Sequence, residues 1–92
     1  MAKKLSLQII FGFSDRTRAA EIENTFLRWL ATSVAKYRPV NFQTRDELLV
    51  LEYDFEGDRS EAYVFVNEIN GQLAKAFSGK LAGRAIIKFV DE

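Results

Sequence analysis

Apolar residues recur along this chain with two different periods, and the order of those periods restricts the fold more than any other feature. Residues 4–13 alternate apolar and polar side chains, as a half-buried strand does. In residues 15–37 and 58–77 the apolar positions instead follow the helical period, which predicts two amphipathic helices. Alternation returns in three further segments, residues 40–45, 48–55 and 81–90. The predicted order is therefore strand, helix, strand, strand, helix, strand.

Local signals predict where the two helices begin and end. Ser14 is a suitable N-cap for the first helix, because its hydroxyl can accept a hydrogen bond from a backbone N–H of the first turn. Pro39 ends that helix, since the residue before a proline is driven out of helical geometry. Asp58, followed three residues later by Glu61, forms a capping box for the second helix. Residues 70–71 are an Asn-Gly pair typical of turns, but the apolar period continues across them, so we expect one helix with a weak point.

The apolar face of each predicted element indicates the core. In the first helix that face includes Val34 and Tyr37; in the short strand after it Val40, Phe42 and Thr44 alternate with polar residues. We expect the following side chains to be nearly free of solvent: Leu7, Ile9, Phe26, Leu30, Leu51, Val66, Ile69, Leu73 and Ile87.

The order of the elements limits the topology. Two strand–helix–strand units with right-handed crossovers can bury both helices only on the same face of one sheet. The expected fold class is therefore α+β, a ferredoxin-like βαββαβ sandwich in which a four-stranded sheet of order 4-1-3-2 carries two helices on one face. We expect a single domain over residues 1–92. The first and third strands should be central and parallel to each other, with residues 40–45 at one edge and residues 81–90 at the other.

The chain contains neither cysteine nor histidine. This excludes disulfides, thiolate metal sites and thiol catalysis, and it removes the commonest general base and metal ligand. We expect no cofactor. The longest apolar run is far shorter than the ~20 residues that span a bilayer, and the first residues do not resemble a signal peptide. We accordingly expect a cytoplasmic location without membrane association.

The net charge of the chain is zero, but the charged residues are unevenly distributed along the sequence. Residues 1–45 carry eight Lys and Arg against three Asp and Glu, whereas residues 46–61 carry one against seven. Neutrality argues against a dedicated DNA-binding protein, whose affinity rests on neutralising phosphates. An RNA-recognition sheet is equally unsupported, because no outward position of the first and third strands is aromatic. We do not expect nucleic acid as the partner, although the basic first half leaves a nucleic-acid-binding domain as an alternative.

The acidic segment at residues 54–61 places carboxylates at alternate positions around Gly57, an arrangement that can suit Ca²⁺ or Mg²⁺. The spacing is not that of an EF-hand. Asp58 and Glu61 are explained more simply, because they cap the second helix and complement its dipole. We therefore expect no metal at this acidic edge.

Arg16 and Arg18 stand where the first helix should begin, and a helix N-terminus flanked by arginines can hold a phosphate or a carboxylate. In size and expected fold the chain is similar to the acylphosphatases, which cradle phosphate near this position. Their V-Q-G-V-x-F-R pattern is absent, so the resemblance covers the fold alone. We expect solvated arginines and no catalytic residue. A small enzyme of acylphosphatase-like fold that uses Arg and carboxylates is the other alternative.

The outward face of the predicted sheet carries aliphatic residues at positions where a solvated face is usually polar. Such residues can occur there for β propensity alone, but a contiguous apolar patch often marks a partner site. We expect this face to bind a partner through the following residues: Ile10, Leu48, Val50, Glu52, Arg84, Ile86, Lys88 and Val90. The expected function is a non-enzymatic protein–protein interaction or regulatory module. It should act through its open sheet face or its acidic edge and self-associate as a homodimer.

Overall fold

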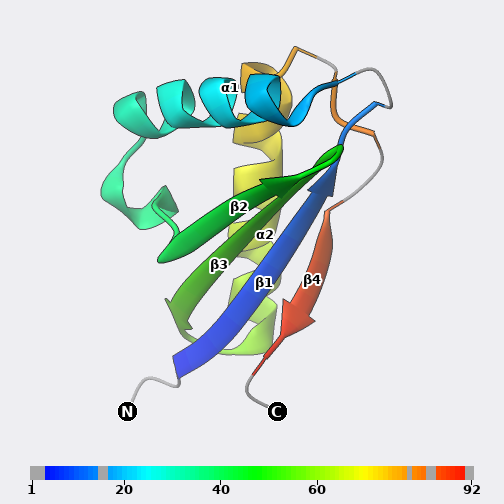
Figure 1. Cartoon of the computed structure of the whole chain (residues 1–92). Coiled ribbons are helices and arrows are strands. Elements are labelled where there is room, and N and C mark those ends of the chain that lie inside the picture. Colours follow the sequence, from blue (N-terminus) through cyan, green and yellow to red (C-terminus); the bar gives the residue numbers. More distant parts are fainter. Residues whose placement is uncertain (1–3, 15–16, 79, 83–84, 91–92) are drawn as a thin grey trace.

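The computed structural model describes residues 4–14, 17–78, 80–82 and 85–90 (Figure 1). Strands and helices follow one another in the order expected from the sequence. The elements are β1 (Lys4–Gly12), α1 (Ala19–Thr32), the short 3₁₀ helix η1 (Ala35–Tyr37), β2 (Asn41–Arg45), β3 (Leu48–Glu56), α2 (Arg59–Ala76) and β4 (Ile86–Phe89).

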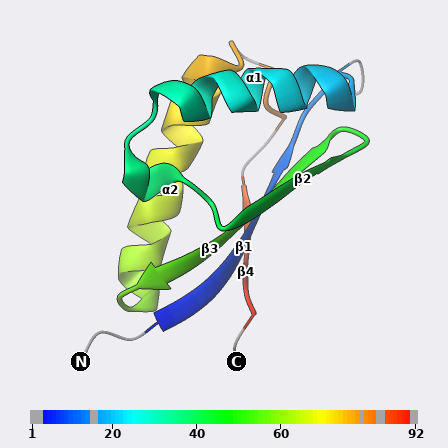
Figure 2. The ribbon, with the colours of Figure 1, turned by 60° about the vertical axis from the view of Figure 1, so that its left-hand side comes forward.

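The molecule has two layers. Figure 2 shows the sheet nearly edge-on, with α1 and α2 both on one side of it. The described residues place no element on the opposite side, so one face of the sheet is buried and the other is open. This is the α+β arrangement that the two hydrophobic periods predict.

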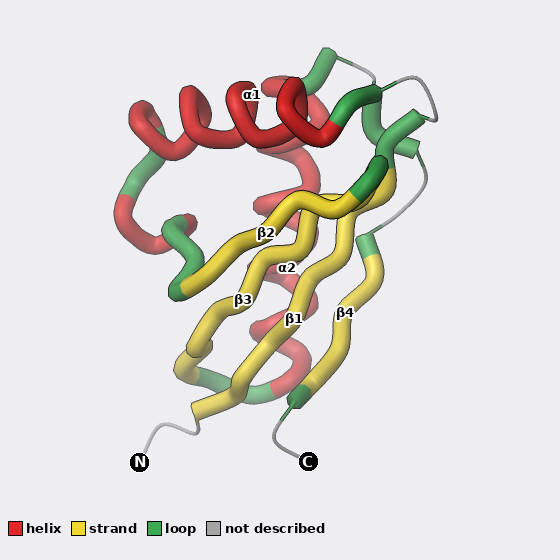
Figure 3. The backbone as a smooth tube through the Cα atoms, viewed as in Figure 1, coloured by secondary structure: helices red, strands yellow, loops and turns green. Residues whose placement is uncertain are grey.

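The four strands form one antiparallel sheet in the order β2-β3-β1-β4, which is 4-1-3-2 when read from the other edge (Figure 3). The prediction that the first and third strands are parallel was wrong, because β1 pairs with β3 in antiparallel register. The reason is the connection at residues 46–47, a two-residue turn that reverses the chain between β2 and β3. Asp46 adopts φ 53° there, a left-handed conformation that Asp tolerates better than most residues. The crossover through α1 makes β1 and β2 run the same way, so β3 between them opposes both.

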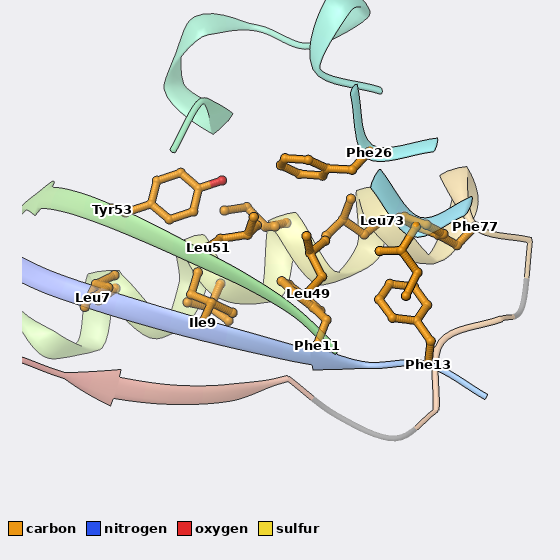
Figure 4. Close-up of a cluster of buried hydrophobic side chains, with 14 residues drawn as sticks. Leu7, Ile9, Phe11, Phe13, Phe26, Leu49, Leu51, Tyr53, Leu73 and Phe77 are labelled. Carbon is orange, nitrogen blue, oxygen red and sulfur yellow. The ribbon is translucent and has the colours of Figure 1, made fainter. Parts of the chain in front are cut away.

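The core lies between the sheet and the two helices, and Figure 4 shows part of it. Alternate residues of β1 and β3 supply one side, and the inward stripes of α1 and α2 supply the other. The buried hydrophobic side chains are Leu7, Ile9, Phe11, Phe13, Ile22, Phe26, Leu49, Leu51, Tyr53, Ala62, Val66, Ile69, Leu73 and Phe77. Two predicted members, Leu30 and Ile87, are only half-buried. Leu30 lies in the last turns of α1 and Ile87 on an edge strand, so each is covered from fewer sides.

Helix α1 begins later than the sequence suggests. Its N-cap is Arg18, which makes no side-chain capping bond, and the prediction of Ser14 as N-cap was wrong. The Ser14 hydroxyl instead bonds to the Thr17 hydroxyl at 2.8 Å, and the Thr17 N–H donates to the Ser14 carbonyl oxygen at 2.9 Å. This turn uses the polar groups of Ser14 before the helix starts.

The same helix also ends earlier than predicted. The Ser33 hydroxyl donates to the Trp29 carbonyl oxygen at 2.7 Å, and the chain then leaves the helix and re-forms a single turn as η1. As a result Val34, predicted to face the core, is 58% exposed. The strand predicted to begin at Val40 begins one residue later, as β2, and Val40 is exposed.

Helix α2 agrees more closely with the prediction. Asp58 and Glu61 form the expected capping box, in which the Glu61 N–H donates to Asp58 Oδ1 at 2.9 Å. The helix continues through residues 70–71 without interruption. Of the described residues in the predicted last strand 81–90, Ile86–Phe89 pair with β1 as β4 and Leu81 makes an isolated bridge to Phe13, while residues 83 and 84 lie outside the described part of the chain.

Candidate functional site

The open face of the sheet carries an apolar row that crosses three strands. The register aligns Val50 of β3 with Ile10 of β1, and Ile10 with Ile86 of β4. Leu48 lies one row further along β3, opposite Gly12 of β1. We call Ile10, Leu48, Val50 and Ile86 the sheet-face patch. Because residues directly opposite each other on antiparallel strands have neighbouring side chains, these four aliphatic groups form one continuous surface.

The exposure of this patch is uneven. Ile86 is 57% exposed on the edge strand and Leu48 is 39% exposed, whereas Ile10 and Val50 are half-buried by their neighbours on both sides. Val90 is also exposed, but its N–H bonds to the Ser6 carbonyl oxygen, which places it two rows away from Ile86. Val90 is therefore not continuous with the apolar row.

A polar row borders the patch on the side that leads toward Val90. Its members are Glu52 on β3, Gln8 on β1 and Lys88 on β4, which are aligned by the register of the three strands. Asn41 of β2 extends this row, and its Nδ2 donates to Glu52 Oε1 at 3.0 Å. The row is thus negative toward one edge of the sheet and positive toward the other. Arg84, also predicted to be at this surface, lies outside the described residues.

The sheet-face patch consists of aliphatic side chains. Aliphatic side chains supply no acid, base or nucleophile, and the described residues contain no group of three or more carboxylates able to hold a metal ion. Arg18, considered for anion binding, is exposed at the N-cap of α1, and Arg16 lies outside the described residues. The other described Lys and Arg residues of the first 45 positions are spread over β1, α1, η1, β2 and the connections between them. They are not gathered on one element.

A second candidate site is a groove of about 540 Å³ where β3 ends and α2 begins. Its lining residues are Lys36, Asp54, Phe55, Glu56, Glu61, Val64, Phe65 and Glu68. We call it the acidic groove. The sequence predicts the acidic edge that it includes, but not the contributions of α2 and η1. The signal available for α2 was the helical spacing of residues 61, 64, 65 and 68, which places them on one stripe.

The electrostatics of the acidic groove centre on Glu68. Its Oε2 accepts a hydrogen bond from Lys36 Nζ at 3.2 Å and another from the Tyr37 hydroxyl at 3.2 Å. These bonds lower the pKa of Glu68, and the carboxylate in turn raises the pKa of Lys36. Lys36 is therefore engaged with Glu68, and no other Lys or Arg among the described residues lines the groove.

A third concavity of about 560 Å³ lies between α2 and the β4 segment. Within it, Asn70 Oδ1 is buried and has no hydrogen-bond partner in the described part of the chain. No helix among the described residues is long and apolar enough to cross a lipid bilayer.

Comparison of the chain with protein-family models, curated proteins and solved structures finds no match. The function is therefore inferred from the arrangement of the chain's own residues, namely the sheet-face patch and the acidic groove.

Proposed function

We propose that this chain is a ferredoxin-like protein–protein interaction module that self-associates through its open sheet face. The observation that supports this proposal is the continuous row formed by Val50, Ile10 and Ile86 on a face that no described element covers. Aliphatic residues can lie on a solvated sheet for propensity alone. Propensity alone would scatter such residues over the sheet. Here they occupy adjacent positions on three strands and form one continuous apolar surface.

The hydrophobic effect provides the driving force for such an association. Removing apolar surface from water contributes roughly 25 cal/mol per Å², before the loss of translational and rotational freedom is subtracted. Four aliphatic side chains form a small patch, so we expect a dimer of micromolar affinity. Such a dimer is concentration-dependent.

The polar row beside the patch favours a two-fold arrangement. A two-fold axis through the patch can bring Glu52 of one copy near Lys88 of the other, and the reverse pair then forms by symmetry. Charges at the rim of an interface mainly set orientation and association rate. A closed dimer is thereby favoured over an open filament.

The test is light scattering after size-exclusion chromatography, supported by sedimentation equilibrium. We expect the wild type to dimerise at high micromolar concentration and Ile86→Glu to be monomeric, because the new carboxylate would be buried at the interface. Val34→Glu is the matched control, since Val34 has nearly the same exposure, 58% against 57%, and lies in the connection after α1. A wild type that stays monomeric, or equal losses in both variants, would remove the support for self-association.

A charge exchange tests the two-fold arrangement separately. Lys88→Glu should weaken the dimer, and adding Glu52→Lys should restore it, because the exchanged charges again face opposite charges. Dimerisation that is unchanged by Lys88→Glu, or not restored in the double variant, would contradict this orientation while leaving the apolar contact in place.

A further inference from the structure

Strand β3 continues beyond the strand that pairs with its outer edge. The register of β2 on β3 ends at the pair Asn41 and Glu52, whereas β3 runs on to Glu56. Residues 53–56 pair with β1 on one side, and the described residues place no strand on the other. Figure 1 and Figure 3 show this end of β3 projecting past the start of β2.

The backbone of this segment is oriented for pairing. The Val40 N–H donates to the Glu52 carbonyl oxygen at 2.8 Å on the β2 side of β3. Because backbone groups of a strand point to alternate sides, the N–H and C=O of Asp54 point to that same side. The residue before Val40 is Pro39, which has no N–H with which to continue the ladder. Within the described part of the chain, the edge beside Asp54 therefore has no pairing strand.

The acidic groove lies directly along this edge, on the helix side. Phe55 from β3 and Phe65 from α2 form its apolar floor, with ring centroids 5.2 Å apart. Val64, which is 59% exposed, extends this apolar surface along α2. An apolar side chain carried by an added strand would reach this floor, because side chains of a strand alternate between the two faces of the sheet.

The charge of the groove selects the other residues of such a strand. Four acidic residues line the groove, Asp54, Glu56, Glu61 and Glu68, against one basic residue, Lys36, which already bonds to Glu68. Asp54 and Glu56 are exposed. They occupy alternate positions with Glu52 along β3, so their side chains point, like that of Glu52, to the open face of the sheet. Negative charge of this kind repels the same edge of another copy and attracts a basic segment.

We propose that residues 53–56 bind an extended segment of a partner protein in which large apolar residues alternate with Lys or Arg. The segment adds to the sheet as a strand antiparallel to β3, as β2 does further along the same edge. Its apolar side chains enter the groove over Phe55 and Phe65, and its basic side chains lie beside Asp54 and Glu56. This site is separate from the sheet-face patch and does not depend on self-association.

The test uses a synthetic peptide, acetyl-Lys-Leu-Lys-Phe-Lys-amide, titrated into the full chain by isothermal titration calorimetry. Three altered peptides serve as comparisons. The first has Glu in place of each Lys, the second carries N-methyl groups on the lysine amides, and the third carries them on the leucine and phenylalanine amides. In an antiparallel pairing the lysine opposite Asp54 shares its open-face side and turns its amide toward β3. The second peptide, which loses these amide hydrogen bonds, and the first, whose carboxylates are repelled by the acidic residues, should bind at least about tenfold more weakly. The third should bind nearly as well as the parent.

The protein variants test the same site from the other side. Asp54→Lys combined with Glu56→Lys should weaken binding of the parent peptide at least about tenfold, since two attractions become repulsions. Glu23→Lys, an exposed reversal on α1 outside the groove, is the matched control and should leave binding unchanged. Amide chemical shifts on titration should change along residues 53–56 and the facing stripe of α2.

Several results would overturn the proposal. They are no binding of the parent peptide at millimolar concentration, equal binding of the two methylated peptides, equal weakening by the control variant, or shift changes centred on the sheet-face patch. The comparison of methylated peptides uses the wild-type chain, so it stands even if the double variant fails to fold.

Discussion

Replacing Gly57 by alanine tests how the chain turns from β3 into α2. Gly57 has φ 144°, a backbone conformation that residues with a Cβ rarely adopt. A Cβ at this position would lie 2.9 Å from Phe55 Cε2 and 3.2 Å from the Cδ and Oε1 atoms of Glu61. The substitution therefore strains the backbone, displaces an aromatic ring of the acidic groove and disturbs the capping box of α2.

The size of the effect follows from these contributions. Backbone strain in this region costs about 1–3 kcal/mol. Displacing the Phe55 ring from its preferred rotamer costs about 0.5–1.5 kcal/mol more. The lower conformational entropy of the unfolded alanine chain offsets about 0.4–1 kcal/mol of this. The midpoints of these ranges combine to a net loss of about 2 kcal/mol in the free energy of unfolding.

Gly71→Ala is a control that makes the same chemical change, and we expect it to have the opposite effect on the free energy of unfolding. It lies inside α2, is exposed, and a Cβ there would meet no other atom within 4 Å. Glycine in a helix interior is less favourable than alanine by roughly 0.5–1 kcal/mol. Gly71→Ala should therefore stabilise the chain by about that amount.

The assay is urea and thermal unfolding followed by circular dichroism, with both variants and the wild type at one protein concentration. For a domain of this size, 1 kcal/mol corresponds to a shift of roughly 4–8 °C in Tm. Tm should fall in Gly57→Ala and rise in Gly71→Ala. A Gly57→Ala variant as stable as the wild type, or a destabilised Gly71→Ala, would refute the backbone reasoning at that position.

Three further outcomes are expected. Phe26→Ala should lower the free energy of unfolding by about 3–5 kcal/mol in urea titration, because Phe26 is fully buried against Phe42 and its loss leaves a cavity. Burial raises the pKa of Tyr53, whose hydroxyl donates to the Tyr37 carbonyl oxygen at 2.5 Å. The folded chain then keeps a proton that the unfolded chain releases above about pH 10, so stability should be full below that pH and fall above it, and Tyr53→Phe should reduce this fall in unfolding measured at several alkaline pH values. Thermal melts with millimolar Ca²⁺, with Mg²⁺ and with chelator should coincide, whereas saturable stabilisation that is lost in Asp58→Ala would reveal a metal site at the acidic edge.

The sequence by itself determined the features that depend on neighbouring residues. The period of two predicted which side chains of β1 and β3 face the core, such as Ile9 and Leu51, because alternate residues of a strand must face opposite sides. The spacing of Asp58 and Glu61 likewise predicted the capping box, since both partners lie within one helical turn. The outward direction of the four residues of the sheet-face patch was predictable for the same reason, although Val90, predicted to join them, lies two rows away.

The ends of α1 and the degree of burial were predicted less well. Helix α1 starts after Ser14 because the hydroxyl of that residue bonds to Thr17, a choice that the presence of a capping residue does not reveal. Val34 is exposed because the helix ends before it. Leu30 and Ile87 have apolar spacing suited to the core, but how many sides of a residue are covered depends on where its element lies in the sandwich.

Only the tertiary structure decided the direction of the strands and the position of the acidic groove. The antiparallel pairing of β1 with β3 follows from how a short turn and a long crossover combine in space. The groove joins Lys36, Phe55 and Phe65 from three elements, and its open edge exists because β2 pairs with only part of β3. Local patterns specify the face on which a side chain lies, whereas the packing of whole elements specifies which side chains meet.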